Sequence, residues 1–134
     1  MTDLELLQLA VAARDFSYAP YSHFRVGAAL LGKSGRVYTG CNVENASYTP
    51  TNCAERTAVF KAVSEGETSF TAIAVVGGKD GELSPLCAPC GVCRQVLSEF
   101  CNADLRVILG TPEAITVTDL GSLLPFSFGK KDLT

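Results

Sequence analysis

Apolar residues recur along this chain at two spacings, one typical of helices and the other typical of strands. Near the start, Leu4, Leu7 and Val11 follow the helical spacing. Just before them, Thr2 can act as an N-cap and Glu5, three residues later, can complete a capping box. We therefore expect a first helix that runs to about Ser17.

Five later apolar stretches have the length of strands. The predicted strands are residues 24–31, 36–41, 70–76, 105–109 and 115–117. The other predicted helices are residues 53–64 and 90–100, with a last helical turn at 119–124. The first two strands flank the turn Gly32-Lys33-Ser34-Gly35 and should form a hairpin. A hairpin followed by strand–helix units predicts an α/β fold, a mixed sheet with helices on its faces.

The composition is that of one globular domain over residues 1–134, with 47% hydrophobic and 19% charged residues. The formal net charge of −3 and the lack of a Lys/Arg run argue against binding to nucleic acid or to a membrane surface. No apolar run is long enough for a membrane span, and the acidic start, with Asp3 and Glu5, is unlike a secretion signal. We expect a cytoplasmic protein whose six cysteines are ligands, catalytic groups or packing residues rather than disulfides.

The candidate chemistry lies in Cys53, Cys90 and Cys93, with Glu55 two residues after the first cysteine. Three thiolates can hold a zinc ion and leave its fourth position open, whereas structural zinc sites usually close with four protein ligands. Glu55 could then reach a water at the open position and act as a proton shuttle. All three cysteines fall at predicted helix starts, where free N–H groups and the helix dipole favour the thiolate.

A zinc ion with three thiolate ligands is anionic, so it is a weaker Lewis acid than zinc held by neutral histidines. Something must draw charge from the sulfurs, and the helix ends do so only in part. Arg56 follows Glu55 directly and is a natural donor to a thiolate. We expect an Arg56–thiolate hydrogen bond that tunes the metal.

The same residues allow other interpretations. Cys87 forms a second Cys-x-x-Cys with Cys90, so it could close a structural site of four cysteines. A thioredoxin-like redox pair would fit part of the pattern, as would a Glu55 that is only a solvated acid of a first helical turn. Cys41 and Cys101 have no ligand partner nearby and are expected to be small packing residues.

Several longer segments resemble a known family. They are Tyr18-Ala19-Pro20-Tyr21-Ser22, Phe24-Arg25-Val26-Gly27-Ala28-Ala29, Gly40-Cys41-Asn42-Val43-Glu44-Asn45-Ala46-Ser47-Tyr48, Cys53-Ala54-Glu55-Arg56, Pro89-Cys90-Gly91-Val92-Cys93-Arg94-Gln95 and Leu123-Leu124-Pro125. With them the chain resembles the small, homotetrameric, zinc-dependent cytidine deaminases from about Phe16 to Phe128. Cys-x-Glu followed by Pro-Cys-x-x-Cys is the three-cysteine form of the zinc nucleobase deaminase pattern.

The resemblance implies a three-layer α/β/α fold with a mixed five-stranded sheet. It also implies the hydrolytic deamination of cytidine and deoxycytidine to uridine and deoxyuridine, with release of ammonia, in pyrimidine salvage. By this resemblance, Cys53, Cys90 and Cys93 hold one Zn²⁺ per subunit. A zinc-bound hydroxide then attacks C4 of the base, and Glu55 shuttles protons.

The resemblance also implies substrate-binding residues. Asn42 and Glu44 match residues that hydrogen-bond the ribose, and an amide and a carboxylate two apart at a strand end point the same way. Phe24 matches the aromatic beside the pyrimidine. Ala54 matches the residue whose backbone contacts the base.

The implied oligomer is a homotetramer with active sites shared between subunits. Near the C-terminus, the family places an aromatic residue in a neighbouring subunit's site. Phe126 and Phe128 both follow Pro125, and Phe128 aligns better. The region from Asn45 to Tyr48 and the C-terminal segment would then lie at interfaces.

One segment departs from the family pattern. The family commonly runs from Ser-Pro directly into Cys-x-x-Cys, whereas here Leu86-Cys87-Ala88 intervenes, so the choice of cysteine pair stays open. Cys90 and Cys93 are favoured because the residues after them continue as in the family. A deaminase of another nucleoside and a non-enzymatic zinc module are the competing functions.

Overall fold

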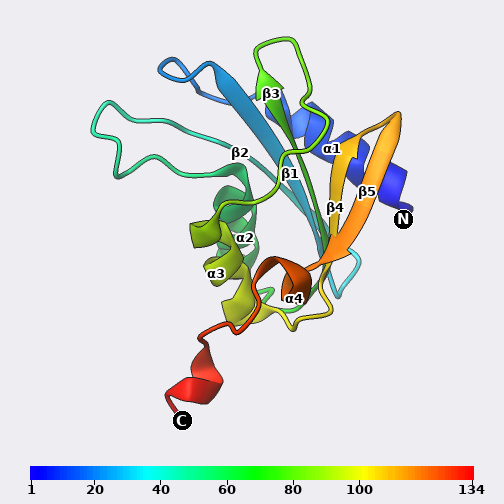
Figure 1. Cartoon of the computed structure of the whole chain (residues 1–134), viewed down its shortest axis with the longest axis vertical. Helices are drawn as coiled ribbons and strands as arrows, with labels where there is room; N and C mark the ends of the chain where they lie inside the picture. Colours follow the sequence, from blue (N-terminus) through cyan, green and yellow to red (C-terminus); the bar gives the residue numbers. More distant parts are fainter.

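The computed structural model describes residues 1–134 and contains one mixed sheet with helices on both faces (Figure 1). In chain order the elements are α1 (Asp3–Arg14), β1 (Phe24–Gly32), β2 (Val37–Cys41), α2 (Ala54–Ser64), β3 (Phe70–Lys79), α3 (Gly91–Phe100), β4 (Arg106–Thr111), β5 (Ala114–Asp119), α4 (Leu120–Leu123) and η1 (Lys130–Asp132). The sheet order is β2-β1-β3-β4-β5, and β3 and β4 form its parallel pair. The expected five-stranded α/β fold is confirmed.

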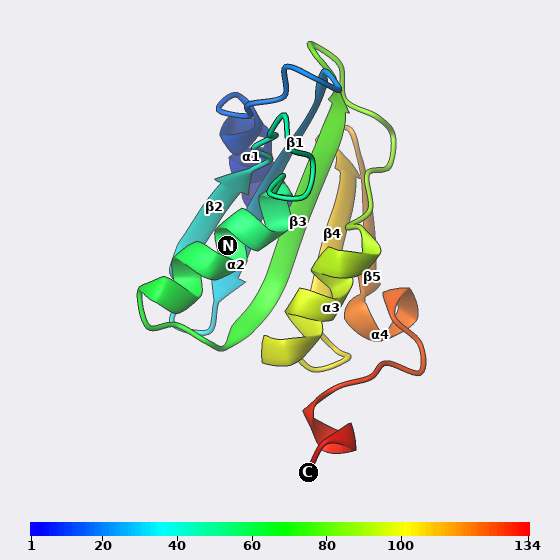
Figure 2. The same ribbon diagram turned by 90° about the vertical axis from the view of Figure 1, so that its left-hand side faces the viewer.

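Side chains of the central strands alternate between two cores, because successive residues of a strand point to opposite faces of the sheet. On one face α1 packs on the sheet, and on the other α2 and α3 lie side by side (Figure 2). The core under α1 includes Ala74 and Val76 of β3, whereas Ile73 and Val75 of the same strand face α2 and α3. The expected three layers follow from this double-sided burial.

The start of α1 is confirmed and its end is earlier than expected. Thr2 Oγ1 accepts from the Glu5 N–H at 3.1 Å, and Glu5 Oε1 accepts from the Thr2 N–H at 2.9 Å, which is the capping box. The helix ends at Arg14 rather than near Ser17. The chain turns there because Tyr18 pairs with the segment after β2, donating its N–H to the Asn42 carbonyl at 3.0 Å.

Two strands are each three residues longer than the sequence suggested. β3 continues past Val76 to Lys79, since Gly77 and Gly78 pair with β1 although glycine disfavours strands. β5 covers Ala114–Asp119 rather than residues 115–117, because its whole length pairs with β4. No helix in the structure has both the length and the apolar character that a membrane span requires.

A glycine in β2 sets the position of α2. A Cβ at Gly40 would lie 2.4 Å from the Ala54 carbonyl oxygen and 2.7 Å from the Ala58 nitrogen. The first turn of α2 therefore lies directly on the backbone of β2. This contact fixes the part of α2 that carries Glu55, next to Cys53.

Candidate active site

The N-terminal ends of two helices bring three cysteines together. Cys53 is the N-cap of α2, Cys90 is the N-cap of α3, and Cys93 lies in the first turn of α3. Their sulfur atoms all lie within 4.8 Å of one another, and those of Cys53 and Cys90 are 3.7 Å apart. The prediction that these cysteines stand at helix starts is confirmed.

Hydrogen bonds favour a thiolate at Cys53. Donation from Cys93 and from Arg56 lowers the pKa of Cys53 to about 5, although partial burial opposes the shift. The same contact raises the pKa of Cys93, since Cys93 keeps the proton that the two sulfurs share. Arg56 Nη2 lies 3.3 Å from Cys53 Sγ, so the expected Arg56–thiolate hydrogen bond is present.

Glu55 is a buried carboxyl beside this cluster. Its side chain is 4% exposed, and its Oε1 atom is buried without a hydrogen-bond partner. Burial raises the pKa of Glu55 to about 7, and the negative charge of Cys53 adds to the effect. A carboxyl group with a pKa near neutral pH can both accept and donate a proton under physiological conditions.

The donor set fits a zinc ion. The sulfur atoms of Cys53, Cys90 and Cys93 lie close enough to hold one ion together, and as thiolates they are ligands of the kind that zinc prefers. The unpaired Oε1 of Glu55 is a buried polar atom that a metal-activated water would satisfy. The cluster thus offers three protein ligands, one fewer than the four of a closed structural zinc site.

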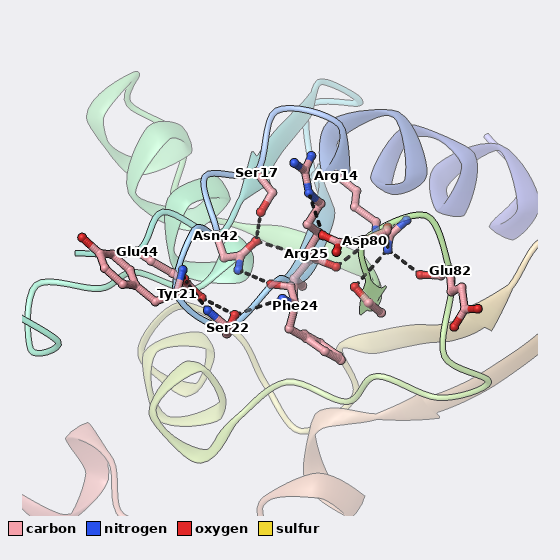
Figure 3. A network of polar contacts seen from close by, with 12 residues as sticks. Arg14, Ser17, Tyr21, Ser22, Phe24, Arg25, Asn42, Glu44, Asp80 and Glu82 are labelled. Carbon is pink, nitrogen blue, oxygen red and sulfur yellow. Dashed lines mark hydrogen bonds and ion pairs between the residues drawn. The ribbon is translucent and has the colours of Figure 1, made fainter. Parts of the chain in front are cut away.

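Asn42 lies at the end of β2, where its buried side chain is held by the segment that precedes β1 and by β1 itself. Its Oδ1 atom accepts from the Val26 N–H at 2.9 Å and from the Ser17 hydroxyl. Its Nδ2 atom donates to the Phe24 carbonyl at 2.8 Å. The side chain is 8% exposed, so these contacts fix its orientation (Figure 3).

Glu44 holds the turn before β1. Its Oε1 atom accepts from the N–H groups of Tyr21 at 3.0 Å and Ser22 at 3.1 Å, and its Oε2 atom accepts from the Ser22 hydroxyl (Figure 3). The hydrogen bonds from Ser22 lower the pKa of Glu44, so the carboxylate is ionised at neutral pH. An open pocket next to Glu44 is lined by Tyr21, Ser22, Glu44, Asn45, Tyr48 and Thr51.

The remaining predicted site residues occupy different environments. Phe24 begins β1 and is partly buried, and Ala54 is the fully buried first residue of α2. Phe128 is 59% exposed, and its carbonyl accepts from Gln95 Nε2 at 2.9 Å. The segment after α4 extends away from the sheet in both ribbon views (Figures 1 and 2), and the side chains of Phe126 and Phe128 in this segment are exposed.

Cys87 stands apart from the sulfur cluster. The group of sulfurs within 4.8 Å of one another contains Cys53, Cys90 and Cys93 and does not include Cys87. A Cβ at Gly77 would lie 2.6 Å from Cys87 Sγ and 3.1 Å from the Phe24 ring, so Cys87 packs in the space that this glycine leaves. Burial raises the pKa of Cys87 to about 11, as expected for an inert packing thiol.

Two arginines, which the sequence did not single out, hold the ends of the loop between β3 and α3. Arg14, 8% exposed, donates only to backbone carbonyls, those of Arg25, Gly78, Asp80 and Glu82. Arg94 Nε donates to the Pro89 carbonyl at 2.7 Å, and its Nη1 donates to the Leu123 carbonyl at 2.7 Å. One signal was available for Arg14: it is a cation at helical spacing from Leu7, on the buried face of α1.

The matched protein family agrees with this site. The family model for the cytidine and deoxycytidylate deaminase zinc-binding region matches residues 1–111, a span that contains all three cysteines and Glu55. This chain belongs to the cytidine and deoxycytidylate deaminase family. Zinc is therefore its cofactor, and Cys53, Cys90 and Cys93 are placed to hold it.

Individual members of the deaminase family resemble the chain over almost its full length. A cytidine deaminase of Sporosarcina psychrophila is 50% identical over 131 residues, which cover 97% of this chain and 93% of the relative. A cytidine deaminase of Halalkalibacterium halodurans is 50% identical and covers 96% of this chain and 95% of its own. The crystal structure of a cytidine deaminase from Burkholderia pseudomallei has a TM-score of 0.86 at 50% identity, with 96% of this chain and 100% of the other covered.

Proposed function

We propose that this protein catalyses the hydrolytic deamination of cytidine and deoxycytidine to uridine and deoxyuridine, with release of ammonia. The observation that carries the proposal is the joint placement of three sulfur ligands and a buried, unpaired Glu55 carboxyl at the ends of α2 and α3. Relatives named as cytidine deaminases at 50% identity over nearly the whole chain support the choice of substrate.

The chain's own residues supply the proton transfers. Cys53, Cys90 and Cys93 would hold zinc, which when bound supplies the Lewis acidity that makes water a nucleophile at neutral pH. Glu55 accepts one proton from the attacking water and gives it to the ring nitrogen; it then takes the remaining proton of that oxygen and gives it to the amino group, which leaves as ammonia as the C4 carbonyl forms. Its pKa of about 7 suits both directions of transfer. Arg56 withdraws charge from Cys53 through their hydrogen bond, and this would offset the charge of three thiolate ligands when zinc is bound.

The sugar side of the site has little hydrogen-bonding capacity left. Both acceptor positions of Asn42 Oδ1 are used, and one N–H of its Nδ2 remains. Three hydrogen bonds already reach Glu44, which leaves roughly one of the about four acceptor positions of a carboxylate. One donor and one acceptor suit a single hydroxyl, so a ribonucleoside and a deoxyribonucleoside could both bind.

Phe24 and Ala54 complete the proposed site on the base side. Phe24 would lie beside the pyrimidine, and the backbone of Ala54 would contact the base. The position of Ala54 between Cys53 and Glu55, at the start of α2, supports this assignment. The partial burial of Phe24 next to Cys87 leaves part of its ring available to a ligand.

We further propose that the single domain assembles into a homotetramer in the cytoplasm and serves pyrimidine salvage. The exposed aromatic side chains of Tyr48, Phe126 and Phe128 support an interface between subunits. Phe128 would then enter a neighbouring subunit's site. The formal net charge of −3 supports a small nucleoside rather than a nucleic acid as the substrate.

An ultraviolet assay of the purified protein tests the main proposal. Zinc-loaded protein should convert cytidine and deoxycytidine, and CMP should serve as the nucleotide comparison. Glu55→Gln should keep its zinc and its fold but lose at least about 10²-fold in kcat. Zinc-loaded protein that leaves cytidine unchanged would overturn the proposal, and a fully active Glu55→Gln variant would remove Glu55 from it.

A further inference from the structure

The turn formed by residues 21–24 contains a hydroxyl that bridges two parts of the proposed site. The Ser22 hydroxyl donates to Glu44 Oε2, and it accepts from the Phe24 N–H at 3.0 Å. Ser22 therefore stands between the carboxylate on the sugar side and the aromatic residue on the base side (Figure 3). Neither the deamination chemistry nor the metal site uses this hydroxyl.

Both backbone groups of Phe24 are held by side chains of the site. Its N–H reaches Glu44 through Ser22, and its carbonyl accepts from Asn42 Nδ2 at 2.8 Å. The residue between them, His23, adopts a left-handed conformation with φ 59°, which is unfavourable for a residue with a side chain. Hydrogen bonds must hold the turn in this conformation, and those to Glu44 are the ones that join it to the site.

We propose that Ser22 is a positioning residue that ties Phe24 to Glu44, so that the turn places the base-side ring and the sugar-side carboxylate as one unit. The proposal rests on the proposed nucleoside specificity of this site. Removal of the hydroxyl takes one of three donors from Glu44 and the only side-chain acceptor from the Phe24 N–H. Substrate binding should weaken, whereas the proton transfers at Glu55 should not change.

The chain contains a matched control at the other end of the β1–β2 hairpin. Ser34 donates its N–H and its hydroxyl to the Glu67 carboxylate at 2.9 and 2.7 Å, and its Oγ accepts from the N–H two residues later, in Arg36, at 3.2 Å. Ser22 makes the same three kinds of contact with Glu44 and Phe24. Both serines are exposed, but none of the residues around Ser34 belongs to the proposed site.

The test compares Ser22→Ala, Ser22→Thr and Ser34→Ala in the zinc-loaded protein. For Ser22→Ala, KM for cytidine and Ki for uridine should rise about tenfold while kcat stays within about twofold, as for one lost hydrogen bond to a charged group. Ser22→Thr keeps the hydroxyl and should restore both constants to within about threefold of wild type. Ser34→Ala should lower the melting temperature by about as much as Ser22→Ala does, and it should leave KM for cytidine and Ki for uridine unchanged.

A second substrate distinguishes the effect of Ser22 on Glu44 from its effect on Phe24. With 2′,3′-dideoxycytidine, which lacks the 2′- and 3′-hydroxyls, the effect of Ser22→Ala should become smaller but persist, because Phe24 is still displaced. If the effect of Ser22→Ala disappeared with this substrate, Ser22 would act only on the Glu44 carboxylate. The proposed connection to Phe24 would then be wrong. Equal kinetic effects of Ser22→Ala and Ser34→Ala would also overturn it. Wild-type turnover in the same assay tests the proposed function separately, whatever the variants do.

Discussion

The buried carboxyl of Glu55 should destabilise the zinc-free protein at neutral and alkaline pH. Its pKa is about 7 in the fold against an ordinary 4.5, so the folded state binds the proton more tightly than the unfolded state. The contribution of this tighter proton binding to the free energy of unfolding is fully present below pH 4.5 and is lost as the pH rises through 7. The difference between the two pKa values corresponds to about 3 kcal/mol. Glu55→Gln removes the buried charge. It should therefore recover much of the lost free energy of unfolding at pH 8, and it should change the free energy of unfolding little at pH 5.

Urea unfolding of chelator-treated protein, followed by circular dichroism at one protein concentration, measures the difference in free energy of unfolding between Glu55→Gln and wild type at each pH. Glu67→Gln is a control of opposite sign, because hydrogen bonds from Ser34 lower the pKa of Glu67 and its ionised form is the stabilising one. At pH 8, Glu55→Gln should therefore be more stable than wild type, and Glu67→Gln should be less stable. If Glu55→Gln matched wild type at both pH values, the burial argument for the proton shuttle would be refuted.

Three further substitutions test other parts of the site. Arg56→Gln should lower zinc occupancy and reduce kcat by about 10–100-fold, measured by metal analysis and the ultraviolet assay, since Cys53 loses its charged donor. Gly40→Ala should destabilise the fold by about 1–3 kcal/mol in urea and reduce activity, because its Cβ would collide with the start of α2. Gly81→Ala, with open space around it, should do neither. Cys87→Ala should keep one zinc ion per subunit. If it lost zinc as completely as Cys93→Ala does, Cys87 would have to be a zinc ligand.

Local patterns in the sequence predicted the elements and the metal cluster well. The capping box at Thr2, the hairpin turn at Gly32–Gly35 and the cysteines at helix starts depend on residues that are close in sequence. The extension of β3 through Gly77 and Gly78 was missed, because those glycines form strand only through their pairing with β1. Pairing between distant segments overrides the weak strand preference of glycine.

The supporting polar contacts could not be predicted, because their partners lie far apart in the sequence. Arg14 and the Gly78 carbonyl are 64 residues apart, and Ser22 and Glu44 are 22 residues apart. Family resemblance assigned Asn42 and Glu44 to the sugar, but it did not indicate that most of their hydrogen-bonding capacity is already used by β1 and by the turn before it. Only the three-dimensional arrangement shows that these two residues also hold the backbone around the proposed site.

The two arginines at the ends of the β3–α3 loop have a consequence for how the loop can change. Arg14 holds the chain as far as Glu82, and Arg94 holds it again at Pro89, immediately before Cys90. The Ser84 N–H also donates to the Gly77 carbonyl at 2.8 Å, whereas residues 85–88 make no backbone–backbone hydrogen bond. We therefore expect residues 85–88 to tolerate changes in length without moving Cys90, and the extra Leu86-Cys87-Ala88 lies within this stretch. Evolution, or a protein engineer, could therefore be expected to insert new sequence in this stretch, next to the sulfur cluster, while Cys90 keeps its place.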